Sequence, residues 1–144
     1  MAKLKGTISI HAPVEKVFGY MADPTNLPEI WPSMVEVKDV KKTPDGAVSG
    51  YNWVYKMAGM RFEGTSETSE AVANQRVVVK NVTGIPSTFV WTYQPEDGGT
   101  KLTVEVEYTV PVPLLGKLAE AFIVKQNEHE ADVMLANLKA RMEA

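Results

Sequence analysis

The feature that most constrains the fold is a run of short segments between Met34 and Val110 in which polar and apolar side chains alternate. Turn-forming residues separate these segments at Pro44-Asp45-Gly46, Ala58-Gly59, Ala73-Asn74, Thr83-Gly84 and Asp97-Gly98-Gly99. Alternation with a period of two residues, interrupted by such turns, predicts consecutive β-hairpins. Because connections this short cannot hold a parallel crossover, the hairpins predict an antiparallel meander.

One face of this predicted sheet is rich in aromatic residues. The clearest strand alternates apolar residues from Leu102 to Val110 with Thr103, Glu105, Glu107 and Thr109, which predicts one buried and one solvated face. Other segments place large aromatic side chains on a single side: Tyr51, Trp53 and Tyr55; Phe62; and Phe89, Trp91 and Tyr93. We expect these side chains to lie on the buried face together with Tyr108.

Two helix signals precede the hairpins. An extended stretch from Leu4 to Ile10 is followed by Pro13, which suits the first position of a helix, and by Glu15 in the first turn. Asp23-Pro24 repeats this signal, and the second short helix would end before Pro32. The first strand therefore joins the sheet across two helices, and only there do we expect a departure from antiparallel pairing.

Residues 114–142 contain no proline and a single glycine, which predicts a long C-terminal helix. Its apolar residues fall on two nearly opposite stripes at 100° per residue. The stripe that we expect to face inward holds Leu114, Leu118, Phe122, His129, Val133, Ala136 and Ala140. The opposite stripe holds Val124, Ala131, Leu135, Leu138 and Met142. Both broad faces of the helix must therefore contact something.

The widths of the sheet and the helix raise the question of a cavity. Seven strands spaced about 4.8 Å apart form a sheet roughly 30 Å across, whereas one helix with side chains is about 10 to 12 Å wide. The sheet must therefore curl around the helix in an α+β architecture. Either large side chains or a bound ligand would fill the space between them, and the residue pattern leaves both alternatives open.

Length, charge and composition exclude several classes of protein. A chain of 144 residues predicts a single domain, residues 1–144, and a net charge of −3 with scattered Lys and Arg argues against nucleic acid. The absence of cysteine excludes disulfides and thiolate metal sites. No apolar run is long enough for a transmembrane segment, and the alternating N-terminus does not resemble a signal peptide. We therefore expect a cytoplasmic protein.

Motifs for common enzyme chemistry do not occur in the sequence. His129-Glu130 opens a zinc-protease helix motif, but position 133, where the second histidine belongs, is Val133. Neither a Gly-x-Ser-x-Gly elbow nor a phosphate or dinucleotide loop is found. We predict no metal and no cofactor. Because tyrosines with an ordinary pKa near 10 are poor bases, His129 is the one serious candidate for a general base.

The order of these elements resembles a known superfamily. The chain is similar to SRPBCC proteins in the order of its parts. These are the first strand, the Ala12-Pro13-Val14-Glu15-Lys16-Val17-Phe18 helix, the segment from Asp23 to Pro32, the hairpin sheet and a helix ending in residues 138–143. That superfamily includes START domains, the birch-pollen-allergen fold, and polyketide cyclase/dehydrase and lipid transport proteins. The resemblance implies a helix-grip fold whose internal cavity binds lipids, polyketides, isoprenoid quinones or similar molecules.

Specific residues follow from this interpretation. The residues expected to line the ligand cavity are Trp53, Tyr55, Phe62, Phe89, Trp91, Tyr93, Tyr108, Leu118, Phe122, His129 and Val133. The residues expected at the cavity entrance are Trp31, Met34, Leu114 and Leu115.

Three functions remain open at this point, and the residues favour the first. The first is non-enzymatic binding or transport of a small hydrophobic ligand, which leaves room for a transient membrane or protein contact. The second is a polyketide cyclase/dehydratase-like enzyme with His129 as general base. The third is a co-chaperone-like interaction module acting through the outer sheet face, which carries Thr103, Glu105 and Glu107.

Overall fold

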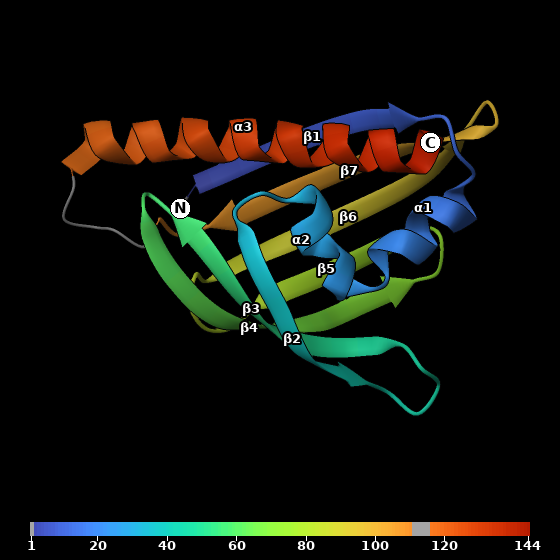
Figure 1. Ribbon diagram of the computed structural model, residues 1–144, viewed down its shortest axis with the longest axis horizontal. Helices are drawn as coiled ribbons and strands as arrows, with labels where there is room; N and C mark the ends of the chain where they lie inside the picture. Colours follow the sequence, from blue (N-terminus) through green and yellow to red (C-terminus); the bar gives the residue numbers. More distant parts are fainter. Residues whose placement is uncertain (1, 111–115) are drawn as a thin grey trace.

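The fold is a curved sheet crossed by one long helix, seen in a computed structural model that describes residues 2–110 and 116–144 (Figure 1). The strands are β1 (Ala2–Ile10), β2 (Met34–Lys42), β3 (Val48–Met57), β4 (Met60–Val72), β5 (Arg76–Asn81), β6 (Ser87–Glu96) and β7 (Gly99–Tyr108). The helices are α1 (Val14–Met21), the 3-10 turn η1 (Pro24–Asn26), α2 (Leu27–Ile30) and α3 (Gly116–Glu143).

The seven strands form one sheet in the order β1-β7-β6-β5-β4-β3-β2, and every neighbouring pair is antiparallel. The expectation that β1 departs from antiparallel pairing is wrong. The segment from α1 to α2 carries the chain from one edge of the sheet to the other, so β1 pairs with β7, and Ala2 lies opposite Tyr108. The meander predicted for β2 to β7 is confirmed.

The turns and helix starts follow local chemistry. Ala58, Asn74, Gly59 and Gly98 all have positive φ angles, as tight hairpin turns require. Pro13 precedes the first helical residue of α1 and does not occupy it, a shift of one position from the prediction. The carboxylate of Asp23 accepts a hydrogen bond from the Thr25 amide at 3.0 Å and caps η1.

Helix α3 packs against β1 and presents the face opposite to the predicted one. Its buried residues are Ile123, Ala131, Met134, Leu135, Leu138 and Met142. Leu118 is 91% exposed and Phe122 is 61% exposed, and His129 is exposed as well. The placement of this stripe on the inside is therefore wrong. Because apolar residues occur all around the helix, their periodicity alone does not select the buried face.

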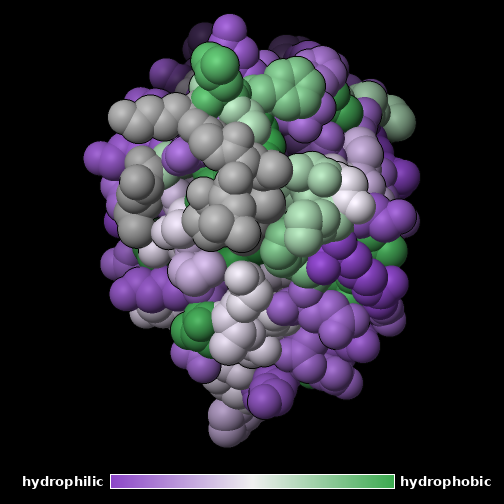
Figure 2. Space-filling model, turned by 90° about the vertical axis from the view of Figure 1, so that its left-hand side faces the viewer, coloured by the Kyte–Doolittle hydropathy of each residue, from purple (hydrophilic) through white to green (hydrophobic). Residues whose placement is uncertain are grey.

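Gly6 of β1 lets α3 lie close to the sheet, because a Cβ there would come within 2.8 Å of Leu135 Cδ1. The core beneath the helix includes Val17, Leu102 and Leu138, which are fully buried. Figure 2, which faces the end of the molecule near the start of α3, shows apolar side chains on a largely hydrophilic surface. None of the helices within the described residues is both long and apolar enough to cross a membrane.

Candidate functional site

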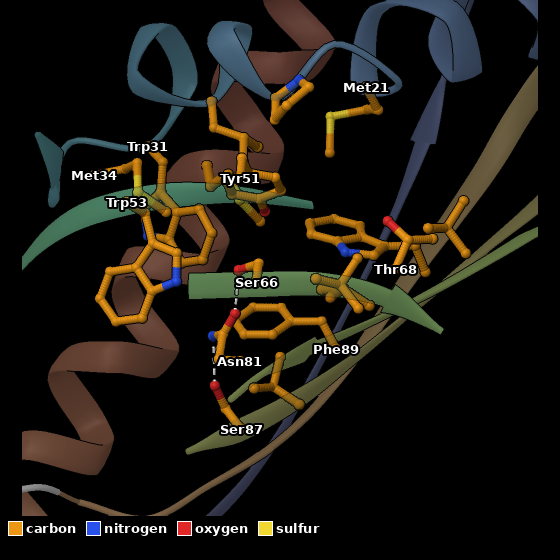
Figure 3. A pocket seen from close by; sticks show the side chains of 18 of the residues that line it. Met21, Trp31, Met34, Tyr51, Trp53, Ser66, Thr68, Asn81, Ser87 and Phe89 are labelled. Atoms are coloured by element: carbon orange, nitrogen blue, oxygen red, sulfur yellow. Dashed lines mark hydrogen bonds between the residues drawn. The ribbon is translucent and has the colours of Figure 1, made fainter. Parts of the chain in front are cut away.

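A cavity of about 420 Å³ lies between the concave face of the sheet and the helices. Side chains from α1, the α2 region, α3 and all strands from β1 to β7 contribute to its wall. Figure 3 shows Met21, Trp31 and Met34 on one side of this space and Phe89 on the sheet opposite. The volume falls within the range of about 300 to 1,000 Å³ that is usual for small-molecule sites.

Aromatic rings form much of the cavity wall. The ring of Trp31 makes edge contacts with Tyr55 and Phe89, with centroids 5.4 and 5.8 Å apart. Phe89 and Trp91 are stacked on β6, with centroids 6.3 Å apart and ring planes 15° apart. Phe18 of α1 meets Tyr93 edge-on at 5.0 Å. These rings give the site large, flat apolar surfaces.

A line of polar side chains crosses the apolar wall at one end of the cavity. Strand pairing places Tyr51 opposite Ser66, Ser66 opposite Asn81, Asn81 opposite Ser87, and Ser87 opposite Tyr108. All five residues line the cavity, and we call them the polar row. Ser66 hydrogen-bonds to Asn81, whose amide nitrogen donates to Ser87 Oγ at 2.6 Å, as the dashed lines in Figure 3 show.

The polar row is anchored by further hydrogen bonds at Ser87 and Tyr108. Ser87 Oγ donates to the Ile85 carbonyl at 2.9 Å. Beyond Ser87, the Tyr108 hydroxyl accepts a hydrogen bond of 2.9 Å from the Asn127 amide nitrogen of α3. The row therefore connects the sheet to the long helix by hydrogen bonds at the cavity wall.

Trp53 of β3 lies next to the polar row. Two glycines of neighbouring segments, Gly64 and Gly84, leave room for its ring. A Cβ on Gly84 would come within 2.8 Å of Trp53 Cη2, and a Cβ on Gly64 would meet the same ring and the Thr83 carbonyl. Trp53 is only 3% exposed, and its Nε1 has no hydrogen-bond partner within the part of the chain that the structure describes. Figure 3 shows this nitrogen on the side of the ring that faces Ser66.

The cavity wall carries no charged side chain among the residues that the structure describes: none of those lining it is Asp, Glu, His, Lys or Arg. Tyrosines are its only titratable groups there. Burial raises the pKa of Tyr55 and of Tyr93 far above the usual value. Burial also raises the pKa of Tyr51, while a hydrogen bond with Ser66 acts in the opposite direction. These tyrosines are therefore neutral at physiological pH and poor proton acceptors.

These raised pKa values predict a loss of stability in alkali. Unfolded tyrosines ionise near pH 10, whereas Tyr51, Tyr55 and Tyr93 stay protonated in the folded protein, so folding stability is complete below pH 10 and falls above it. Each such tyrosine removes about 1.4 kcal/mol per pH unit above its unfolded pKa. Urea denaturation between pH 8 and pH 11.5 measures the loss. Tyr93→Phe should make it shallower, and an unchanged slope would contradict the assignment.

Some of the residues predicted from the sequence to line the cavity do line it in the structure, and the others do not. Six of them line the cavity: Trp53, Tyr55, Phe89, Trp91, Tyr93 and Tyr108. Phe62 packs against the core but does not reach the cavity wall. Leu118, Phe122 and His129 are exposed on α3, and Val133 is half-buried outside the wall. These four residues lie outside the wall because α3 buries the face opposite to the predicted one.

Only two of the four residues predicted at the cavity entrance can be compared with the structure. Trp31 and Met34 line the cavity, whereas Leu114 and Leu115 lie outside the described residues. His129 instead borders a surface hollow between α3 and the end of β3, and it does not line the cavity. A general base at His129 therefore does not face this cavity.

Sequence reasoning missed the polar residues of the wall. Ser66, Asn81 and Ser87 occupy inward-facing positions of their strands, as Val79 and Phe89 do. The alternation of side chains along the strands could therefore have identified them as wall residues. Asn127 lies four residues before Ala131 on the buried face of α3, so it was recognisable only once that face was known.

With the site described, comparison with known proteins identifies the family. The sequence model for the family described as polyketide cyclase/dehydrase and lipid transport matches residues 1–143. The chain belongs to this family. Its seven-stranded curved antiparallel sheet around a long C-terminal helix is the helix-grip α+β fold of the SRPBCC superfamily. No curated protein matches the chain in sequence.

Solved structures share this polyketide cyclase/dehydrase fold over nearly the whole chain. A protein from Thermus thermophilus is 19% identical, with a TM-score of 0.82, over 98% of this chain and 97% of that chain. A START superfamily protein from Mycobacterium smegmatis is 16% identical, with a TM-score of 0.82 and the same coverage of 98% and 97%. The Zhui aromatase/cyclase from Streptomyces sp. R1128 is 15% identical, with a TM-score of 0.77, over 99% and 93%.

Proposed function

We propose that this member of the polyketide cyclase/dehydrase and lipid transport family binds and carries a small hydrophobic molecule in the cavity. The observation that carries this proposal is a space of about 420 Å³ whose described wall is mostly aromatic and aliphatic and includes the polar row. Burial of a ligand's apolar surface there contributes about 25 cal/mol per Å² before the costs of association are counted.

The same wall argues for binding over catalysis. Acid–base chemistry needs a group whose pKa lies near the working pH, within hydrogen-bond reach of the substrate. The described wall offers only tyrosines with raised pKa values, and His129 is exposed outside it. A cyclase or dehydratase that uses His129 as its base therefore has no support in this geometry.

The outer face of the sheet gives little support to an interaction module. Its acidic residues are matched by neighbouring lysines, with Lys3 3.5 Å from Glu107 and Lys5 3.8 Å from Glu105. Such exposed pairs contribute little energy and leave no concentrated charge for a partner to recognise.

We place the entrance at the end of the cavity away from the polar row. The wall residues that are themselves exposed to solvent gather there, at the end of β4 and in the turns after α1, β2 and β4: Ala22, Gly46, Ala47, Ala71 and Ala73. All have small side chains, which leave an opening that larger residues would close. Trp31 and Met34, the entrance residues expected from the sequence, lie deeper along the wall.

Ligand uptake by the purified chain tests this function. The uncharged fluorescent probe N-phenyl-1-naphthylamine should bind with one-to-one stoichiometry and gain fluorescence as it leaves water. Native mass spectrometry of protein purified from its own host should show a bound apolar compound that the probe displaces. Protein that is consistently empty and also fails to take up the probe would refute the proposal.

A further inference from the structure

The polar row differs chemically from the rest of the cavity, and this difference limits the ligands that fit. The register places Tyr51, Ser66, Asn81, Ser87 and Tyr108 on five adjacent strands from β3 to β7, all facing the same space. Several of the next inward positions along these strands are apolar, among them Val79, Phe89 and Val106, whereas on β4 the next inward residue is Thr68. A ligand in this cavity therefore meets a group of adjacent polar side chains at the row, whereas Thr68, Tyr55 and Tyr93 lie among apolar residues elsewhere on the wall.

The hydrogen bonds within the row leave capacity for a ligand at its centre. Asn81 has two amide protons and an oxygen with two lone pairs, and it uses one proton toward Ser87 and one lone pair toward Ser66. The side chain is half-buried and lines the cavity, so its remaining positions are available there. A carbonyl or hydroxyl oxygen at this point would accept a hydrogen bond from the remaining amide proton.

A buried donor beside the row points to the same chemistry. Trp53 Nε1 is buried without a partner in the described chain, on the ring edge that faces Ser66 in Figure 3. A buried polar group without a partner is costly, so a ligand group that bonds to this indole N–H is favoured. Because an indole N–H can only donate, that ligand group is an acceptor.

The described wall carries no charged side chain, and this limits which acceptor groups a ligand can place there. A carboxylate or phosphate buried here would have no cation to pair with among the described lining residues. Burying an unpaired charge costs far more than burying a carbonyl group, so an ionised head group is disfavoured.

Resting on the proposed function, we propose that the polar row, centred on Asn81, is the polar subsite of the cavity and that it binds an uncharged oxygen of the ligand. The ligand class is an apolar, ring-containing molecule with a ketone or similar neutral oxygen at one end. That oxygen lies at the polar row beside Trp53, and the rings lie along Phe89 and Trp91 toward the entrance. Asn81 is the residue that sets this specificity.

Three probes of nearly equal shape test the preference: methyl 2-naphthyl ketone, 2-ethylnaphthalene and 2-naphthoate. By isothermal titration calorimetry at pH 7.5, the ketone should bind about fivefold more tightly than the hydrocarbon, in keeping with the net effect of one hydrogen bond. The naphthoate should bind at least about tenfold more weakly than the ketone. The ¹³C resonance of a labelled ketone carbonyl in the complex should lie downfield of its position in hexane, as hydrogen bonding to the carbonyl oxygen requires.

Asn81→Leu keeps the approximate shape of the side chain and removes its hydrogen bonds. We expect the variant to lose the fivefold preference for the ketone over 2-ethylnaphthalene. The matched control is Asn52→Leu on the outer face of β3, where Asn52 bonds to Asp39 and Thr65 away from the cavity. The control should keep the preference.

The outcomes separate this inference from the proposed function. Equal binding of all three probes, tightest binding of the naphthoate, or a bound carbonyl resonance like that in hexane would overturn the inference and leave hydrophobic binding intact. Uptake of none of the probes would overturn both. The carbonyl resonance in the wild-type protein decides the matter even where Asn81→Leu does not fold.

Discussion

The Ala131→Phe variant is expected to lose uptake of N-phenyl-1-naphthylamine, with its affinity reduced by about tenfold or more. Ala131 is 8% exposed on the inner face of α3 and forms part of the cavity wall. A benzyl group at this position projects into space that the ligand needs, while the helix backbone is unaffected. Fluorescence titration of the probe measures the loss, and thermal denaturation checks that the variant is folded.

Two other substitutions on the same helix serve as controls. Ala136→Phe adds the same group at an exposed position five residues further along, and His129→Ala removes the histidine expected from sequence to face the cavity. Both should bind the probe within about twofold of the wild type. Full uptake by Ala131→Phe, or loss of uptake in His129→Ala, would contradict the assignment of the inner face.

Gly64→Ala is expected to destabilise the protein by about 3 kcal/mol or more, or to prevent folding. A Cβ at this position would lie within 2.8 Å of Trp53 Cη2 and still closer to the Thr83 carbonyl, which belongs to the backbone and cannot turn aside. Urea denaturation measures the change, and near-ultraviolet circular dichroism reports on the Trp53 environment.

Gly19→Ala is the matched control for that substitution. A Cβ on Gly19 meets nothing within 4 Å, and the residue is exposed in α1. Alanine is favoured over glycine in a helix by about 1 kcal/mol, so this variant should be slightly more stable than the wild type. If Gly64→Ala unfolded at the same urea concentration as Gly19→Ala, the close packing of Trp53 on Gly64 would be wrong.

The sheet was predictable because its signals are local. Alternation in the segment ending at Tyr108 depends only on which neighbours are apolar, and turns such as Asn74 and Gly98 require conformations that few residues adopt. The position of β1 was harder to predict because it depends on a long-range pairing. Antiparallel pairing with β7 is set by where α1 and α2 bring the chain, which no local pattern records.

The orientation of α3 was not predictable from its composition. Leu118 and Phe122 are as hydrophobic as Leu135 and Leu138, so the sequence offers two competing faces. The buried face includes the polar Asn127 and the small Ala131, because a helix that borders a cavity does not have to fill it. A rule that places the largest apolar residues inside therefore selects the wrong face.

The site was predicted best where its side chains are aromatic. Trp53, Tyr55 and Trp91 carry a large hydrophobic surface and share a face with their strand neighbours, so alternation suffices to place them on the wall. Ser66 and Asn81 obey the same alternation, but polar residues in strands are normally assigned to solvent. Their inward position makes sense only when the five-strand register is known.

The pairing of Ala2 with Tyr108 also affects how the chain is made. A ribosome releases β1 first, yet its hydrogen-bonding partner β7 is completed only at residue 108, and α3, which packs on β1, follows still later. Until then the apolar face of β1 has no cover, so the first strand is the last to gain its place in the sheet. The cavity is therefore sealed only after α3 has been made.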